Sequence, residues 1–384
     1  MNTALAELQE RVRAAAAHHL PLRIRGGGSK DFLGESLQGE ILDTRPLRGI
    51  SSYEPSELVV TVQAGTPLRE LEAALAEQGQ CLAFEPPHFS PTTTVGGMVA
   101  AGLAGPARAS VGPVRDYVLG VQLINGKAEL LSFGGTVMKN VAGYDVSRLM
   151  VGAMGTLGLI TEVSLKVLPF APSEATLRFE MDQATALAQL HHWGSQPLPL
   201  NASNWVPDVG NAESAEKAER AKVMGSLYLR LRGAVAAVEA ACTQMQTLGG
   251  QRMDAASTAN DWRACRDMQL PFFNSVNSMA LWRLSVPQTT PLLNLPFAQL
   301  MDWHGALRWL WAPADATSQI VAAAKAAGGS ALVYWATDAA GQPTKPQPVT
   351  LSAMSAPLRQ IHTRLKAEFD PEHIFNPGRL FANL

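Results

Sequence analysis

The sequence has few cysteines, no long apolar run and no basic excess, and each absence excludes a class of protein. The chain of 384 residues holds only Cys81, Cys242 and Cys265, which stand far apart and form no CxxC pair. This spacing supports neither an iron–sulfur cluster nor a disulfide-stapled secreted fold, so we expect a reducing compartment. No apolar segment approaches the roughly 20 residues that a membrane-spanning helix needs.

The net charge and the first 20 residues both favour a globular protein of the cytoplasm. A net charge of −2, with 47% hydrophobic and 17% charged residues, is typical of a globular protein with ordinary cores, and the length allows two domains. It argues against binding to nucleic acid or to an anionic membrane surface. In residues 1–20 the spacing of Leu5, Leu8 and Val12 predicts a surface helix and not a cleavable signal, so we expect a cytoplasmic protein.

Residues 111–167 combine a hairpin signal, a glycine-rich loop and a closing strand. Asn125-Gly126 stands between two apolar segments, and this residue pair predicts a hairpin with a two-residue type I′ turn. A short helix after Asp145 leads into glycines at every third position, Gly152, Gly155 and Gly158. Such a loop brings backbone close to a neighbour or a ligand. Alternating apolar residues from Val163 to Val167 then predict a strand with one buried face.

Two other glycine-rich loops precede this segment. Gly26 to Lys30, GGGSK, follows a predicted strand at 22–25, and consecutive glycines there let backbone N–H groups form an anion site. It is neither a dinucleotide-binding GxGxxG run, because Asp31 stands at the last glycine position, nor a Walker loop. In the second loop, hydroxyls at Thr92 to Thr94 and the pair Gly96-Gly97 come just before a helix of small residues. Each loop alone also fits a plain turn or a closely packed helix.

The three loops in this order, with the runs KNVAGYD and GTLGLITEVSLKV, resemble the flavin domain of the vanillyl-alcohol oxidase or PCMH superfamily. The resemblance implies an α+β fold: a PCMH-type two-subdomain FAD-binding domain with a ferredoxin-like α+β cap domain. FAD is expected to be noncovalent, because residues 26–34 lack the histidine of covalently linked members, while His88 near the second loop has no assigned role. The implied FAD-binding residues are Gly26, Gly27, Gly28, Ser29, Lys30, Thr93, Thr94, Val95, Gly96, Gly97, Gly143, Gly158, Ile160, Thr161 and Asn376.

The resemblance also divides the chain. It implies an FAD-binding domain at 1–171, a substrate or cap domain at 172–354, and a tail at 355–384 that returns to the FAD domain. The tail run DPEHIFNPGRL carries the family pattern at Asp370, Asn376, Gly378 and Arg379.

Little of the family's catalytic chemistry is visible in the predicted cap. Related hydroxyacid dehydrogenases carry a metal-binding HxGDGN run, whereas WHGALRW here keeps only His304-Gly305, so we expect no metal site. His304 and Arg308 are weak catalytic candidates. A guanidinium can clamp a carboxylate with two hydrogen bonds, although arginines in such a domain usually form surface ion pairs. The candidates are Arg263, Arg266, Arg283 and Arg308. Met98, Ala101 and Met154 stand where relatives have polar groups near the flavin.

The whole-chain order is similar to the FAD-binding E subunits of bacterial glycolate oxidases. That implies a subunit of an FAD-dependent oxidoreductase that oxidises glycolate, a 2-hydroxy acid, to glyoxylate. Its expected partners are a larger flavoprotein subunit and an iron–sulfur subunit, which would be able to hold it at the inner face of the membrane. Two alternatives stay open: a self-sufficient D-2-hydroxyacid dehydrogenase of D-lactate type, and an assembly scaffold with vestigial FAD binding. Trp303, Trp309 and Trp311 fit either an exposed partner surface or a buried core.

Overall fold

The computed structural model describes residues 3–35, 37–135, 145–208, 223–344 and 355–381. These residues form two compact units. The first unit contains the described residues of 1–104, 113–170 and 350–384, and the second contains those of 105–112 and 171–349. Within the described residues no helix is both long enough and apolar enough to span a membrane.

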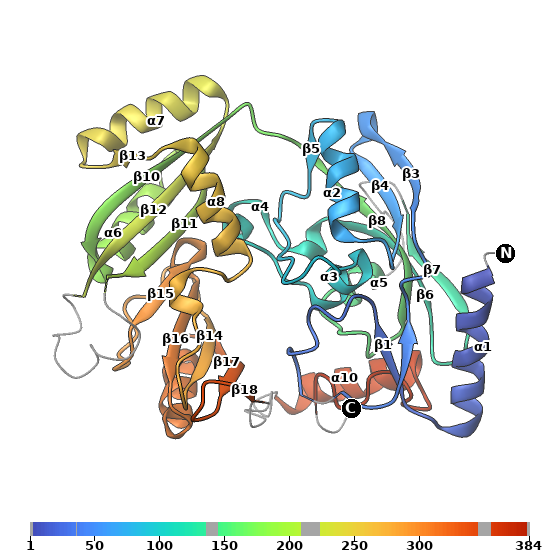
Figure 1. Cartoon of the computed structure of the whole chain (residues 1–384). Helices are drawn as coiled ribbons and strands as arrows, with labels where there is room; N and C mark the ends of the chain where they lie inside the picture. Colours follow the sequence, from blue (N-terminus) through green and yellow to red (C-terminus); the bar gives the residue numbers. More distant parts are fainter. Residues whose placement is uncertain (1–2, 36, 136–144, 209–222, 345–354, 382–384) are drawn as a thin grey trace. The chain divides into compact units, whose positions relative to one another are not determined.

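The first unit is built on a five-stranded antiparallel sheet in the order β3-β4-β8-β6-β7 (Figure 1). Its strands are β3 (Ile50–Glu54), β4 (Val59–Gln63), β6 (Val118–Ile124), β7 (Leu130–Gly134) and β8 (Leu159–Lys166). Two strand pairs accompany it: β1 (Leu22–Arg25) with β2 (Glu40–Asp43), and β5 (Gln80–Cys81) with β9 (Leu168–Pro169). The helices are α1 (Thr3–His18), α2 (Leu68–Glu77), α3 (Val95–Ala101), α5 (Val146–Leu149) and α10 (Ala356–Phe369).

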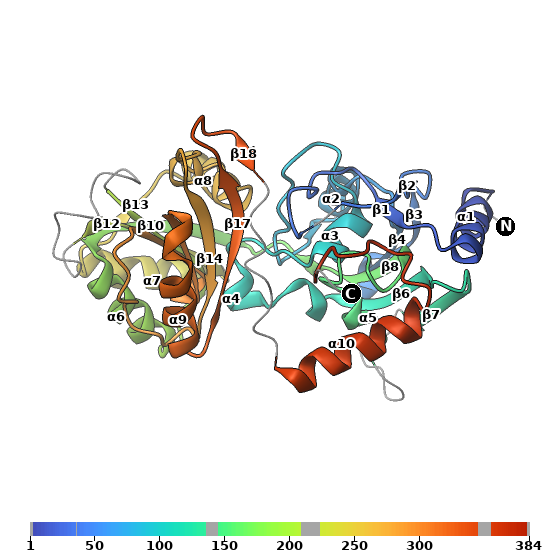
Figure 2. The same ribbon diagram turned by 90° about the horizontal axis from the view of Figure 1, so that it is seen from below.

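The C-terminal tail joins the β1–β2 pair. Leu22 donates its amide to the Ile374 carbonyl over 2.7 Å, and Asn376 donates to the Leu22 carbonyl over 2.9 Å. Phe375 is fully buried in the same cluster as Val12 and Leu42. Figure 2 shows the end of α10 near β7, where the rings of Phe369 and Phe133 lie 6.2 Å apart. The tail therefore runs beside the strand that leads into the first glycine-rich loop.

The β6–β7 hairpin exists, but its predicted two-residue turn is wrong. Asn125 donates to the Glu129 carbonyl and accepts from Ala128, and Ala128 has the positive φ of 60°. This is a three-residue loop built on a type I turn. Gly126 instead lets the end of α10 approach the loop closely. Its amide donates to the Phe369 carbonyl, and a Cβ at this position would lie 2.6 Å from Asp370 Oδ1. Packing against the end of α10 thus overrides the local turn preference.

The second unit has one nine-stranded antiparallel sheet made of two similar halves (Figure 1). The first half, β13-β10-β12-β11, has the strand order of a ferredoxin-like β-α-β-β-α-β unit. The second half has the same strand order when it is read from the other edge, β17-β14-β16-β15, with a loop in place of the first helix. Strand β18 pairs with β17 at the edge of the sheet. Strands β11 and β15 join the halves. The ferredoxin-like α+β fold expected for this part of the chain is confirmed, whereas its role as a substrate or cap domain stays a prediction.

The strands and helices of this unit have the following bounds: β10 (Ser173–Asp182), α6 (Gln183–Gly194), β11 (Leu200–Pro207), β12 (Met224–Gly233), α7 (Val235–Thr247), β13 (Gln251–Arg252), α8 (Ala255–Arg266), β14 (Ala280–Ser285), β15 (Gln299–Asp302), β16 (Leu307–Ala312), α9 (Thr317–Ala326), β17 (Ser330–Thr337) and β18 (Pro343–Thr344). The short helix α4 (Arg108–Val111) also belongs to it.

Alternation along the strands sets the two faces of the second sheet. Leu227 and Leu229 of β12 pack in one core with α6 and α7, whereas Tyr228 packs with Trp262 of α8 on the other face. The Trp303, Trp309 and Trp311 side chains are at most 5% exposed. They belong to the interior of this unit, so of the two interpretations the buried core is correct and the exposed surface for a partner is not.

Residues 105–112 lie in the second unit, although the sequence assigned them to the first domain. The Trp303 indole N–H donates to the Gly105 carbonyl over 2.9 Å, and the Ser110 hydroxyl lies 3.1 Å from His304 Nε2. These contacts hold α4 against the second unit.

Candidate functional site

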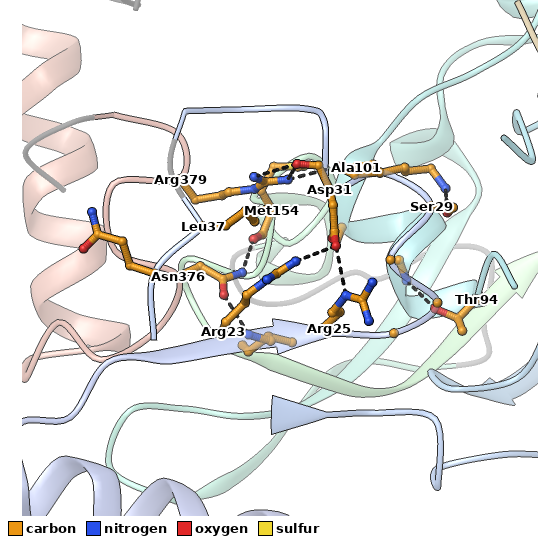
Figure 3. A pocket seen from close by; sticks show the side chains of 18 residues that line it. Arg23, Arg25, Ser29, Asp31, Leu37, Thr94, Ala101, Met154, Asn376 and Arg379 are labelled. Carbon is orange, nitrogen blue, oxygen red and sulfur yellow. Dashed lines mark hydrogen bonds and ion pairs between the residues drawn. The ribbon is translucent and has the colours of Figure 1, made fainter. Parts of the chain in front are cut away.

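A pocket in the first unit gathers the first glycine-rich loop, the start of α3 and the C-terminal tail (Figure 3). It joins segments from both ends of the chain. Its lining residues are Arg23, Ile24, Arg25, Gly26, Gly27, Gly28, Ser29, Lys30, Asp31, Leu37, Gln38, Thr94, Gly97, Ala100, Ala101, Met154, Asn376 and Arg379.

Threonine hydroxyls hold the two glycine-rich loops together. Thr92 Oγ1 donates to the Gly27 carbonyl over 2.8 Å, and Thr93 Oγ1 lies 2.9 Å from Ser29 Oγ. A Cβ on Gly27 would lie only 1.6 Å from the Thr92 carbonyl oxygen, so the backbones meet without room for a side chain. Gly28 adopts a φ of +72°, which glycine reaches at little cost. The first loop is therefore fixed in shape by the second.

The pocket is strongly cationic. Arg23, Arg25, Lys30 and Arg379 line it, against the single carboxylate of Asp31. Asp31 Oδ2 lies 2.5 Å from the guanidinium nitrogen Nη2 of Arg23 and 2.9 Å from Arg25 Nε, so one carboxylate pairs with two arginines (Figure 3). Burial lowers the pKa of Arg379 to about 10, which still leaves it charged at neutral pH. The excess of positive charge suits a ligand with more than one negative charge.

Backbone donors add to this positive field. Among the described residues, the amides of Gly26, Gly27 and Gly28 donate to no protein acceptor. Arg23 Nε is also buried without a partner in that set. Successive amides beside cationic side chains form the kind of cradle that binds phosphate oxygens. These groups fit a diphosphate.

The tail closes the pocket from the other side. Asn376 Oδ1 accepts from the Ile24 amide over 2.7 Å, and Asn376 Nδ2 donates to the Met154 carbonyl over 2.6 Å. The Arg379 guanidinium donates to the Lys30 carbonyl over 2.9 Å. Asn376 thus bridges β1 and the loop before β8, and Arg379 holds the end of the GGGSK loop.

The second glycine-rich loop is less open than its sequence indicates. The Gly96 amide donates to the Ala64 carbonyl over 2.7 Å, and the Gly97 amide donates to Thr94 Oγ1 over 3.3 Å. Val95 is fully buried, and its amide is bonded to Thr66. The two amides that the glycine pair seemed to leave free are therefore occupied, and Gly97 and Thr94 contribute to the pocket wall.

The remaining predicted cofactor residues lie elsewhere. Gly143 falls outside the described residues. Gly158 precedes β8, while Ile160 and Thr161 lie on this strand beside β6, and Thr161 Oγ1 donates to the Gln122 carbonyl over 3.1 Å. None of these three lines the pocket. Their part in cofactor binding stays a prediction.

Sequence reasoning missed part of the pocket. Arg23 and Arg25 belong to the short strand β1, to which the sequence analysis assigned no functional residue. Their signal was their place immediately before the triple glycine. Ala101 and Met154 do line the pocket in place of the polar groups of relatives, whereas Met98 is buried away from it.

The catalytic candidates His304 and Arg308 lie in the second unit and are buried. Burial lowers the pKa of His304 to about 4, so it is neutral at pH 7, and its Nδ1 has no partner among the described residues. Arg308 is fully buried and donates to the Gly305 and Thr290 carbonyls, which lie 2.7 and 2.8 Å away. Within the described part of the chain no group of three or more His, Cys, Asp or Glu side chains is arranged to hold a metal.

Comparisons with known proteins identify an FAD-binding domain in the first part of the chain. Residues 3–148 match the family described as FAD binding domain. Glycolate oxidase subunit GlcE of Escherichia coli (strain K12) is 43% identical over 98% of this chain and 97% of that protein. D-lactate dehydrogenase of Anaerostipes hadrus is 34% identical, over 44% of this chain and 37% of the relative.

Solved structures extend the likeness to the whole fold. An alkyldihydroxyacetonephosphate synthase superposes with a TM-score of 0.65, covering 97% of this chain and 75% of that one, at 16% sequence identity. At such identity the likeness concerns the fold alone. The identity to GlcE over almost the whole of both chains shows that the chain belongs to the GlcE family of glycolate oxidase subunits, and its first part is an FAD-binding domain.

Proposed function

We propose that the protein binds FAD noncovalently and that the cationic pocket holds the FAD pyrophosphate. The observation that carries this proposal is the combination of four cationic side chains, one carboxylate and three consecutive amides without a protein acceptor among the described residues. When bound, the flavin supplies a hydride acceptor for the oxidation of an alcohol carbon.

The residues of the pocket have distinct tasks in this proposal. The Gly26 to Gly28 amides would bind phosphate oxygens, and Arg23 and Lys30 would offset their charge. Asn376 and Arg379 would position the loop without needing to touch the ligand, because their hydrogen bonds already go to backbone groups of β1 and the loop.

We further propose that the protein works as one subunit of a glycolate-oxidising complex. Its full-length relative GlcE is named a glycolate oxidase subunit. The proposed partners are a larger flavoprotein subunit and an iron–sulfur subunit, and the proposed location is the cytoplasm, at the membrane only through those partners. The low cysteine count supports a partner that carries electrons onward, because the chain holds only three separated thiols.

Cofactor binding is tested first, with the purified chain reconstituted with FAD. Acid precipitation should release the yellow flavin into the supernatant. Colour in the washed pellet would contradict noncovalent binding, and a colourless reconstituted protein would contradict FAD binding.

Turnover then separates the subunit from its alternatives. Oxidation of glycolate and D-lactate is measured with an artificial electron acceptor for the chain alone, the partners alone, and all together. We expect activity only in the complete mixture. Robust turnover by the FAD-loaded chain alone would instead indicate a self-sufficient dehydrogenase, and full activity of the partners alone would indicate a scaffold.

A further inference from the structure

Arg283 of β14 lies over two indole rings inside the second unit. Its guanidinium carbon is 5.3 Å from the ring centroid of Trp303 and 5.9 Å from that of Trp309. Two other contacts fix Trp309: its indole N–H donates to Asp302 Oδ2 over 3.3 Å, and its ring packs edge to face with Tyr334, with 5.0 Å between the ring centroids. The two rings thus form a rigid platform for the cation.

The Arg283 guanidinium has no acceptor in the part of the chain that the structure describes. Among the described residues, no hydrogen bond or ion pair reaches its guanidinium, and the nearby Asp302 carboxyl accepts instead from Asn204, Trp309 and Cys265. The other arginines between residues 171 and 344 in the described part that have acceptors are Arg178, Arg230, Arg232, Arg252, Arg263, Arg266 and Arg308. Arg283 is the exception in its own sheet.

The surroundings favour an anion at this position. Burial lowers the pKa of Arg283, and the positive charge of Arg108, whose guanidinium carbon is 4.3 Å from the Trp303 ring centroid, acts in the same direction. Asp302 and Tyr334 oppose this only in part. Arg283 is nevertheless partly exposed, so its fork of N–H donors remains accessible. A planar guanidinium that is fixed on aromatic rings matches the two oxygens of a carboxylate.

We propose that Arg283, stacked on Trp303 and Trp309, binds the carboxylate of a small 2-hydroxy acid. The choice of a 2-hydroxy acid rests on the proposed function. The assignment of Arg283 as the carboxylate-binding side chain rests on its own geometry and needs no flavin.

Binding is measured by isothermal titration of the full chain with oxalate, a dicarboxylate that cannot be oxidised as a 2-hydroxy acid, and with glycolate. Glycolamide, the neutral analogue of glycolate, and sulfate are the comparison ligands. The variants are Arg283→Met, which removes the charge, and Arg283→Lys, which keeps a charge but loses the fork. Arg232→Met is the matched control, since Arg232 lies in the same sheet and pairs with Glu174.

Arg283→Met should weaken oxalate and glycolate binding by about 10- to 100-fold, Arg283→Lys by a smaller factor, and Arg232→Met should leave it unchanged. Circular dichroism and FAD content check folding, and Arg283→Lys carries the test if the methionine variant does not fold. Unchanged affinity in folded Arg283 variants, no binding by the wild type, or equal binding of sulfate would overturn the proposal. Because no turnover enters this measurement, its failure leaves the proposed function intact, and a loss of FAD binding leaves the oxalate result intact.

Discussion

A buried ion pair at the end of α10 offers the sharpest test of how the tail is held. Lys366 Nζ donates to Asp370 Oδ2 over 2.7 Å, to the Thr156 carbonyl over 2.8 Å and to the Phe375 carbonyl over 2.9 Å, which uses all three of its hydrogens. Asp370 also accepts from the Ile374 and Phe375 amides. The two side chains are 2% and 0% exposed. We predict that Lys366→Met destabilises the first unit.

The magnitude follows from what the substitution leaves behind. Removing one partner of a buried pair typically costs about 3–5 kcal/mol, because the other charge stays buried. Asp370 would keep two amide donors, which favours the lower end, but two carbonyls would lose their donor at about 1 kcal/mol each. We therefore expect a loss of about 5 kcal/mol. The double variant Lys366→Met/Asp370→Asn should lose less than Lys366→Met, since no charge remains.

The free energy of unfolding is measured by denaturant titration, with hydrogen exchange of peptides covering 159–166 and 370–380 to report on the first unit. Lys325→Met, at an exposed lysine of α9, is the control for the change of residue type. FAD affinity should also fall in Lys366→Met, because the tail positions Asn376 in the pocket. A loss below about 1 kcal/mol, or a double variant less stable than the single one, would refute the reasoning.

Three further predictions concern single positions. Burial raises the pKa of Asp302 to about 6 from 3.8, so its proton binds more tightly in the folded state, and stability falls as pH rises from 4 to 6. Each unit between these two pKa values is worth about 1.4 kcal/mol, so the free energy of unfolding of the wild type should fall by about 3 kcal/mol relative to Asp302→Asn over this range and no further at higher pH. Denaturant unfolding measures this difference, and a value that is constant from pH 4 to 7 would contradict the prediction. Gly27→Ala should weaken FAD binding at least about tenfold in a fluorescence titration, because its Cβ meets the Thr92 carbonyl, whereas Gly135→Ala, which has open space, should bind FAD normally. Gly126→Ala should lower the free energy of unfolding by about 1–3 kcal/mol through its clash with Asp370, and equal stability of Gly126→Ala and Gly135→Ala would show that the loop can shift at no cost.

Local sequence signals predicted where the glycine-rich loops lie, but they did not predict which residues these loops contact. The triple glycine and the threonines predicted two loops with special backbone, and the structure brings Gly26 to Lys30, Thr94 and Gly97 to one pocket. The occupied Gly96 amide was not predictable, because its acceptor, the Ala64 carbonyl, lies more than 30 residues earlier in the chain. The two-residue turn predicted at Asn125-Gly126 is wrong for the same physical reason, because the contacts that shape this loop come from Phe369 and Asp370.

The arginines of the second unit show where a sequence stops being informative. Arg263, Arg266, Arg283 and Arg308 were equivalent candidates to bind a carboxylate, since each is a cation in the same predicted domain. Their acceptors separate them: Arg263 has the Asn260 side chain, Arg266 has Asp267, and Arg308 has two backbone carbonyls.

Arg283 alone of the four has aromatic faces and no acceptor among the described residues. The difference arises because β14 lies between β16 and β17, which brings Trp309 alongside Arg283, while Trp303 comes from the turn before β16. Strand order is a property of the folded sheet, so no local pattern around Arg283 encodes it. Arg308 also keeps one nitrogen, Nη1, without a partner in the described part of the chain, but its side chain is fully buried. Arg283 is partly exposed, so its unpaired donors remain within reach of a ligand.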